Sequence, residues 1–121
     1  FFPLAGTPHC TTESCMFRDA LMATPVFHQT RAIVIGISQD PPARSSRFVQ
    51  EHKLTYRVLY DEGRRVMNRW GVSKAMLGLA DSRCTFVVDP SGVVRGMAEG
   101  VFDSAGHIKY AERWLTRIEH E

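Results

Sequence analysis

An uninterrupted apolar run from Ala32 to Ile37 constrains the fold of this chain more than any other stretch. Most of its residues are β-branched, and no polar side chain breaks it. A strand with one solvated face alternates polar and apolar residues, whereas a strand buried on both faces, as in a parallel sheet, does not. The run therefore predicts a buried parallel strand covered by helices.

Helical and extended patterns alternate on both sides of this strand. Helices are predicted at 7–23, 43–52, 61–70 and 107–119, and strands at 56–60, 84–88 and 93–97. Asp40 is the expected N-cap of the helix at 43–52, and Trp70 is expected in the core. Residues 26–31 are expected to form a connection, and residues 71–82 a loop. Strands that alternate with helices and close with a hairpin and a final helix indicate an α/β three-layer sandwich. The 121 residues, 44% of them hydrophobic, suffice for one domain, 1–121, with a core of its own.

The charge pattern argues against nucleic-acid and membrane partners. The net charge is only +2, and Arg64-Arg65 is the one adjacent basic pair. No apolar run has membrane-spanning length, and no leader typical of a signal peptide is present. The three cysteines are an odd number, which disfavours a fully paired secreted framework and favours a reducing compartment.

The first cysteine lies where a helix is expected to begin. Thr7 is a good N-cap, and Pro8 occupies the first helical position, where proline is tolerated. Cys10 then falls in the first turn, near unpaired backbone N–H groups and the positive end of the helix dipole. A thiol there should ionise more readily than in a free cysteine, and the thiolate is the nucleophilic form. Cys10 is therefore a candidate reactive cysteine.

The second cysteine, Cys15, lies five residues further along the same predicted helix. On an ideal helix that spacing separates the two Cα atoms by roughly 8–9 Å. A disulfide usually needs Cα atoms closer than about 7 Å. If Cys10 and Cys15 pair, the first turns of the helix must unwind.

Several motifs resemble the peroxiredoxins of the AhpC/TSA superfamily. Pro3-x-x-x-Thr7-x-x-Cys10 resembles their active-site signature, and Cys10-Thr11-x-Glu13-x-Cys15 resembles the bacterioferritin comigratory protein/peroxiredoxin Q branch. Similar motifs follow in the order expected for that branch: Gly36-Ile37-Ser38, Tyr60-Asp61-Glu62-Gly63, Trp70-Gly71-Val72 and Arg83-x-Thr85-Phe86-Val87-Val88-Asp89-x-x-Gly92. The similarity extends from Phe1 to about Ile118.

The resemblance implies a thioredoxin-like fold with a central mixed sheet. It also implies an upstream β-hairpin and most of a central strand that ends at Phe1-Phe2-Pro3, segments that this sequence does not contain. Without that strand the neighbouring strand edges should be exposed, which favours strand exchange. A monomer is expected by resemblance, and a strand-exchanged dimer is the alternative.

The resemblance also implies the chemistry. Cys10 would attack the peroxide, Thr7 and the backbone N–H of Cys10 would position it, and Arg83 would neutralise developing charge. Pro3 would shield the site. The sulfenic acid on Cys10 would condense with Cys15, and a thioredoxin-type dithiol would reduce the disulfide. An external thiol that replaces Cys15 is the alternative for the resolving step.

The resulting prediction is a thioredoxin-dependent peroxidase that acts on hydrogen peroxide and organic hydroperoxides with no metal, haem or flavin. A redox-sensing or interaction protein of the same fold is the second hypothesis. Cys84 is expected to be a buried core thiol, and His9, next to Cys10, is either an exposed side chain or a cation that promotes ionisation of the thiol. No second cluster completes a zinc site. Bacterial relatives would be cytoplasmic and plant relatives plastidic, so either compartment is possible.

Overall fold

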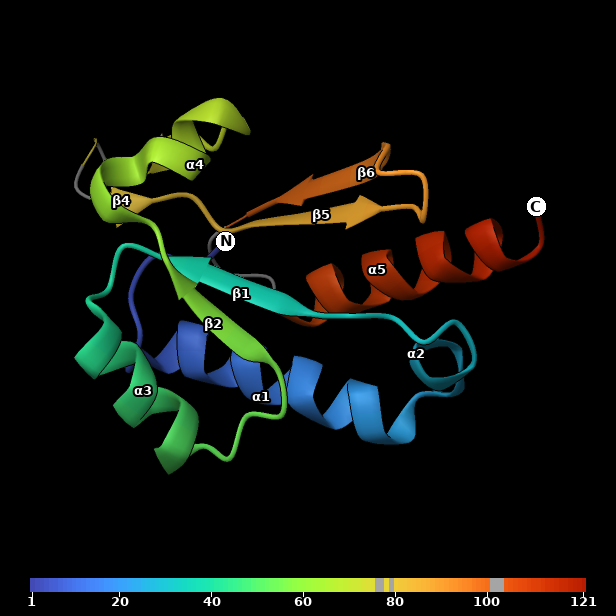
Figure 1. The fold of residues 1–121 in the computed structure, drawn as a ribbon, viewed down its shortest axis with the longest axis horizontal. Coiled ribbons are helices and arrows are strands. Elements are labelled where there is room, and N and C mark those ends of the chain that lie inside the picture. Colours follow the sequence, from blue (N-terminus) through green and yellow to red (C-terminus); the bar gives the residue numbers. More distant parts are fainter. Residues whose placement is uncertain (76–77, 79, 101–103) are drawn as a thin grey trace.

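The structure is a computed structural model that describes residues 1–75, 78, 80–100 and 104–121 (Figure 1). The helices are α1 (Pro8–Ala23), α2 (Pro25–Gln29), α3 (Pro42–Glu51), the 3₁₀ turn η1 (Glu62–Arg64), α4 (Arg65–Arg69) and α5 (Ser104–Glu119). The strands are β1 (Ile35–Ser38), β2 (Arg57–Tyr60), β3 (Lys74–Ala75), β4 (Ala80–Asp81), β5 (Cys84–Val88) and β6 (Val94–Glu99). The helices and strands predicted from the sequence all occur in the predicted order, while α2, β3 and β4 were not predicted.

The described strands form three ladders of two strands each. β1 pairs in parallel with β2, and Ile35 lies opposite Arg57. β5 pairs antiparallel with β6, and Cys84 lies opposite Glu99, as the predicted hairpin requires. The third ladder, between β3 and β4, lies within the segment expected to be a loop. Its strands are only two residues long, too short to leave a periodic pattern in the sequence.

The first two residues connect the parallel and antiparallel ladders. The backbone N–H of Phe2 donates to the carbonyl oxygen of Ile37 on β1, at 3.0 Å. The N–H of Cys84 on β5 donates to the carbonyl oxygen of Phe1, at 3.1 Å. Phe1 and Phe2 thus occupy the position expected for the end of a central strand, between β1 and β5.

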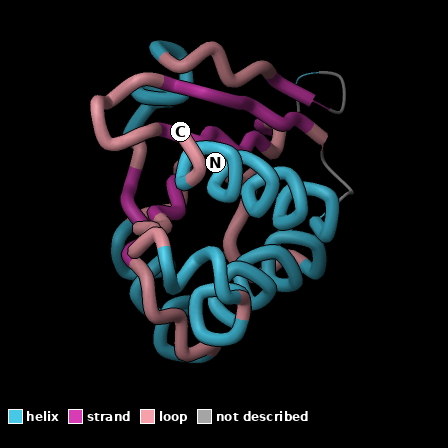
Figure 2. The backbone as a smooth tube through the Cα atoms, turned by 90° about the vertical axis from the view of Figure 1, so that its right-hand side faces the viewer, coloured by secondary structure: helices cyan, strands magenta, loops and turns pink. Residues whose placement is uncertain are grey.

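Long helices pack together on one side of the strands (Figure 2). α1 contacts α5 and α2, while α3 covers β2. Three clusters of buried apolar side chains hold the layers together: Phe2, Ala5, Cys10, Phe48 and Leu54; Ala20, Phe27, Val87, Ile108 and Ala111; and Met67, Val72 and Cys84. The predicted α/β class, with parallel and antiparallel strands, is therefore confirmed. None of the helices in the described part of the chain combines the length and apolar character that a bilayer crossing needs.

Three local expectations are wrong. Residues 26–31 are largely the helix α2, because Thr24-Pro25 starts a new helix and Phe27 buries itself in the core. The strand predicted at 32–37 begins only at Ile35, and Ile33 is 86% exposed. β1 pairs only with β2 among the described strands, so its first residues gain no second neighbour. Trp70, expected in the core, is 41% exposed; its ring meets Phe86 edge to face and Phe1 at a tilt.

Candidate active site

A tight loop carries the chain from Phe2 into α1. The buried carboxylate of Asp40 accepts a hydrogen bond from the backbone N–H of Ala5 at 2.8 Å and one from the Ser38 hydroxyl at 2.8 Å. The Arg44 guanidinium donates to the carbonyl oxygen of Ala5 at 3.1 Å. These contacts tie the loop to β1 and α3, so the start of α1 is held by the sheet rather than by the loop alone.

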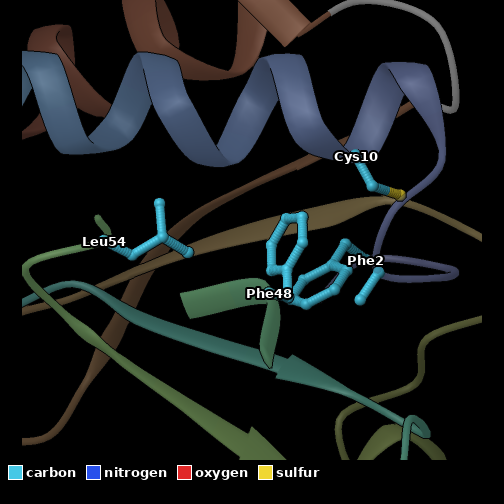
Figure 3. Close-up of a cluster of buried hydrophobic side chains, with 5 residues drawn as sticks. Phe2, Cys10, Phe48 and Leu54 are labelled. Carbon is cyan, nitrogen blue, oxygen red and sulfur yellow. The ribbon is translucent and has the colours of Figure 1, made fainter. Parts of the chain in front are cut away.

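Cys10 occupies the first turn of α1, as predicted. Thr7 is the N-cap residue, Pro8 begins the helix, and Cys10 is its third residue. The Cys10 side chain is 1% exposed and leaves the helix on the side that faces Phe2 and Phe48 (Figure 3). The sulfur is therefore held at the helix N-terminus, with apolar groups on its core side.

Arg83 lies beside this sulfur. Its Nη2 is 3.4 Å from Sγ of Cys10, although 73 residues separate the two in sequence. The Arg83 side chain is 1% exposed, so its charge acts in a site from which water is largely excluded. The structure therefore brings together two of the predicted site residues, the Cys10 thiol and the Arg83 guanidinium.

A buried carboxylate balances the Arg83 charge. Nη1 of Arg83 is 3.0 Å from Oε1 of Glu13, and the Glu13 side chain is 8% exposed. Glu13 lies three residues after Cys10 on α1, so both side chains are on one face of the helix. The same guanidinium thus faces the sulfur with one nitrogen and the carboxylate with the other.

His107 on α5 lies at the far end of this group. Its Nδ1 is 2.7 Å from the Thr85 hydroxyl and 3.9 Å from Oε2 of Glu13. Its Nε2 is 3.0 Å from the carbonyl oxygen of Gly100. The imidazole is buried, with 3% of its side chain exposed. Sequence analysis did not single out His107.

The hydroxyl of Thr7 donates to the carbonyl oxygen of Leu4 at 2.8 Å. Thr7 is therefore the N-cap by position, but its side chain makes no capping hydrogen bond to the helix, contrary to the expectation for a good cap. Its carbonyl oxygen accepts from the N–H of Thr11, which starts the helical ladder. Pro3 is partly buried at the beginning of the same loop.

Cys15 lies on α1 with Cys10, and both thiols are free. Cys15 is partly exposed, unlike Cys10. The helix around it is braced by the Tyr56 hydroxyl, which donates to the carbonyl oxygen of Ser14 at 2.9 Å. Burial raises the pKa of Tyr56 to about 12, so the phenol keeps its proton at neutral pH. The two cysteines share one continuous helix, as the sequence predicted.

Cys84 packs against Met67 and Val72 and is 2% exposed. Burial, reinforced by the negative charge of Glu99, raises the pKa of its thiol to about 11. The expectation of a buried core thiol is therefore confirmed. The side chain of His9 lies outside the described part of the structure. Among the described residues, no group of three or more His, Cys, Asp or Glu side chains is arranged to hold a metal ion.

The positions of three polar residues around the site were not predicted from the sequence. Glu13 was part of a motif but was given no role, although its spacing of three residues from Cys10 predicts that both side chains share one helix face. Asp40 was expected to cap a helix, but Pro41 is the N-cap of α3 and Asp40 instead binds the loop before α1. His107 carried no local signal, because its contacts come from distant segments.

Comparison with known proteins gives a consistent result. The AhpC/TSA family model matches residues 1–97. Chloroplastic peroxiredoxin Q of Suaeda salsa is 38% identical over 118 residues, which cover 98% of this chain and 54% of that protein. Chloroplastic peroxiredoxin Q of Arabidopsis thaliana is 37% identical over 115 residues, 95% of this chain and 52% of that protein. The chain thus spans about half the length of these curated relatives.

Solved structures show the same similarity in three dimensions. Peroxidoxin BcpB from Mycobacterium tuberculosis matches with a TM-score of 0.85 at 33% identity, covering 98% of this chain and 76% of that one. The bacterioferritin comigratory protein of Xanthomonas campestris matches with a TM-score of 0.82 at 25% identity, covering 97% and 75% of the two chains. The family model, the relatives and the fold agree that this chain belongs to the AhpC/TSA family, in its peroxiredoxin Q and bacterioferritin comigratory protein branch.

Proposed function

We propose that this chain is a thiol-dependent peroxidase that reduces hydrogen peroxide and organic hydroperoxides through Cys10. The observation that carries the proposal is the 3.4 Å contact between the Arg83 guanidinium and the Cys10 sulfur, buried at a helix N-terminus. A buried thiol usually resists ionisation, whereas a neighbouring cation and a helix N-terminus favour the thiolate. The alkyl peroxide reduction activity of a structural neighbour, the Xanthomonas campestris protein, supports the same chemistry.

The first step is attack of the Cys10 thiolate on one oxygen of the peroxide. A sulfur–oxygen bond forms as the oxygen–oxygen bond breaks, so the sulfur is oxidised to a sulfenic acid and the peroxide is reduced to an alcohol or water. The departing oxygen takes up the negative charge and a proton. We assign Arg83, the backbone N–H of Cys10 and the Thr7 hydroxyl to the stabilisation of that oxygen, and Pro3 to the exclusion of water.

The second step is condensation of the sulfenic acid with Cys15, which releases water and forms a Cys10–Cys15 disulfide. Both residues lie on the continuous helix α1, so the segment between them must unwind before the sulfurs meet. The partial exposure of Cys15 suits a thiol that has to move. A thioredoxin-type dithiol then reduces the disulfide by exchange, which makes the enzyme an atypical two-cysteine type.

This cycle requires a reducing compartment. The plant relatives are chloroplastic by name, so a plastid is one location that fits, and the cytoplasm is the other. A monomer is sufficient for the cycle, because both cysteines lie in one chain. A strand-exchanged dimer is the alternative assembly.

Single-cysteine variants test the proposal. Cys10→Ser is expected to abolish peroxide consumption, and Cys15→Ser to allow one oxidation of Cys10 but no turnover with thioredoxin. Cys84→Ala is the matched control, because Cys84 lies in the core with Met67 and Val72, and it should retain turnover. Mass spectrometry of the peroxide-treated protein should find Cys10 joined to Cys15. Wild-type protein that consumes no peroxide, or a Cys10→Ser variant that does, refutes the assignment.

Helix content provides a second measurement of the resolving step. Oxidation of the wild-type protein should lower the helical circular dichroism signal, since the turns of α1 between Cys10 and Cys15 unwind. Cys15→Ser should keep its signal after the same treatment. An oxidised wild-type protein with unchanged helix content would mean that Cys10 is resolved by an external thiol.

A further inference from the structure

His107 is a buried titratable side chain to which the proposed peroxidase cycle assigns no part. It belongs to a continuous group of polar side chains that ends at the reactive sulfur. The group runs from Cys10 to Arg83 at 3.4 Å, from Arg83 to Glu13 at 3.0 Å, and from Glu13 to His107 at 3.9 Å. The side chains of Arg83, Glu13 and His107 are each at least nine-tenths buried. The group connects α5 to the N-terminal turn of α1.

The hydrogen bonds of the ring indicate which of its atoms faces Glu13. Nε2 lies 3.0 Å from the carbonyl oxygen of Gly100, which can only accept, so Nε2 carries a proton. Nδ1 lies 2.7 Å from the Thr85 hydroxyl, which can either donate or accept. A second proton on Nδ1 would therefore be accepted by Thr85 and would also face the Glu13 carboxylate.

The outer oxygen of Glu13 lacks a hydrogen-bond donor among the described residues. Oε2 is fully buried, and Nδ1 of His107 lies 3.9 Å away. A buried carboxylate oxygen that accepts no hydrogen bond lowers the stability of the folded protein, and no donor fixes its position. A proton on Nδ1 would give this oxygen a charged neighbour. Glu13 would then be held from both sides, by Arg83 at Oε1 and by His107 at Oε2.

Charge balance favours the same arrangement. Arg83 and Glu13 cancel each other, so ionisation of Cys10 alone would leave a buried negative charge. A protonated His107 restores neutrality to the group. A protonated imidazole on α5 could thus compensate the negative charge of the Cys10 thiolate.

We propose that His107 is a positioning residue for peroxide reduction: protonated at Nδ1, it holds Glu13 and, through Glu13, the Arg83 guanidinium against the Cys10 sulfur. Thr85 orients the imidazole for this task. The proposal rests on the peroxidase function proposed above. It assigns to His107 no contact with the peroxide.

Two substitutions distinguish a residue that positions Glu13 from a residue that only anchors α5 to Gly100. The amide of His107→Asn lies near the place of Nδ1 and can donate toward Glu13, whereas the amide of His107→Gln lies near the place of Nε2 and can donate to Gly100. If His107 only anchored α5 to Gly100, Gln would be the better replacement. If His107 positions Glu13, Asn is the better replacement.

The assay is the single-turnover loss of the Cys10 thiol after mixing with hydrogen peroxide. We expect His107→Gln to slow this oxidation about tenfold, because its amide lies by Gly100 and leaves Oε2 of Glu13 without a donor. His107→Asn should slow it less than about threefold, because its amide can still donate toward Glu13. In a Glu13→Gln background, His107→Gln should have no further effect, because the histidine acts through that carboxylate. Urea unfolding of each variant shows that it is folded.

Three results would overturn the proposal: a His107→Gln rate equal to wild type, an Asn variant slower than the Gln variant, or an undiminished effect in the Glu13→Gln background. If the His107 variants do not fold, Thr85→Val removes the hydroxyl that orients the ring and should slow oxidation severalfold; an unchanged rate refutes the role. A wild-type protein whose Cys10 is not oxidised rejects the peroxidase function itself, and this proposal with it. A reactive wild type with a reactive His107→Gln rejects only the role of His107.

Discussion

Removal of one partner of the buried ion pair between Glu13 and Arg83 should cost this protein a large part of its stability. Glu13→Gln keeps the size of the side chain and removes its charge. The Arg83 charge then remains in a site where it is 1% exposed, without the carboxylate that lies 3.0 Å from it in the native protein. Water cannot replace the lost partner at that depth.

The magnitude follows from the burial of both groups. Removal of one partner of a buried pair costs about 3–5 kcal/mol, because the other charge stays desolvated. A domain of this kind has only about 5–15 kcal/mol of stability in total, so the variant should lose a large fraction of it. Glu119→Gln on the exposed face of α5 is the control, and its stability should stay within about 0.5 kcal/mol of wild type.

Urea unfolding followed by circular dichroism measures both variants. The double variant Glu13→Gln/Arg83→Met should lose less stability than the sum of its two single variants, because it removes both charges of the pair. A cost below about 1 kcal/mol for Glu13→Gln would refute the account, since it would mean that solvent reaches the guanidinium. Fully additive losses would refute the coupling between the two residues.

Two further predictions concern packing and pH. A Cβ on Gly96 would overlap the indole ring of Trp114, so Gly96→Ala should destabilise the protein by about 1–3 kcal/mol in urea unfolding, and unchanged stability would contradict this packing. Tyr56 has its pKa raised by burial to about 12, against about 10 in the unfolded chain, so it favours the folded state fully below pH of about 10 and progressively less up to about 12. The stability advantage of wild type over Tyr56→Phe should therefore shrink across that range by up to about 3 kcal/mol, and a constant difference between the two urea midpoints would count against a buried phenol.

Periodicity predicted the long elements correctly because their causes are local. The β-branched run, the apolar spacing of the helices and the hairpin turn after Val88 each depend on residues within a few positions of one another. The wrong predictions concern residues whose structure depends on segments that are distant in the sequence. Ile33 lies in an ideal strand sequence, yet it is 86% exposed, and the ladder between β1 and β2 begins only at Ile35.

In the candidate site, too, some features were predicted correctly from the sequence and others depend on tertiary contacts. Cys10 was expected from its place at the start of a helix and Arg83 from a motif resemblance, and their contact is found at 3.4 Å. Asp40 was expected at a helix cap but instead binds Ala5, because the fold brings the end of β1 against the loop before α1. Thr7 was expected to cap α1 with its side chain, but its hydroxyl bonds to Leu4 within the preceding turn.

The sequence by itself determined that a helix begins at Pro8 with a cysteine in its first turn and a second cysteine on the same helix, because capping and helical spacing act over a few residues. Only the tertiary structure decided that Arg83, Glu13 and His107 meet behind that cysteine. Their contacts join α1, the start of β5 and α5, and such contacts depend on how sheet and helices pack rather than on any spacing along the chain.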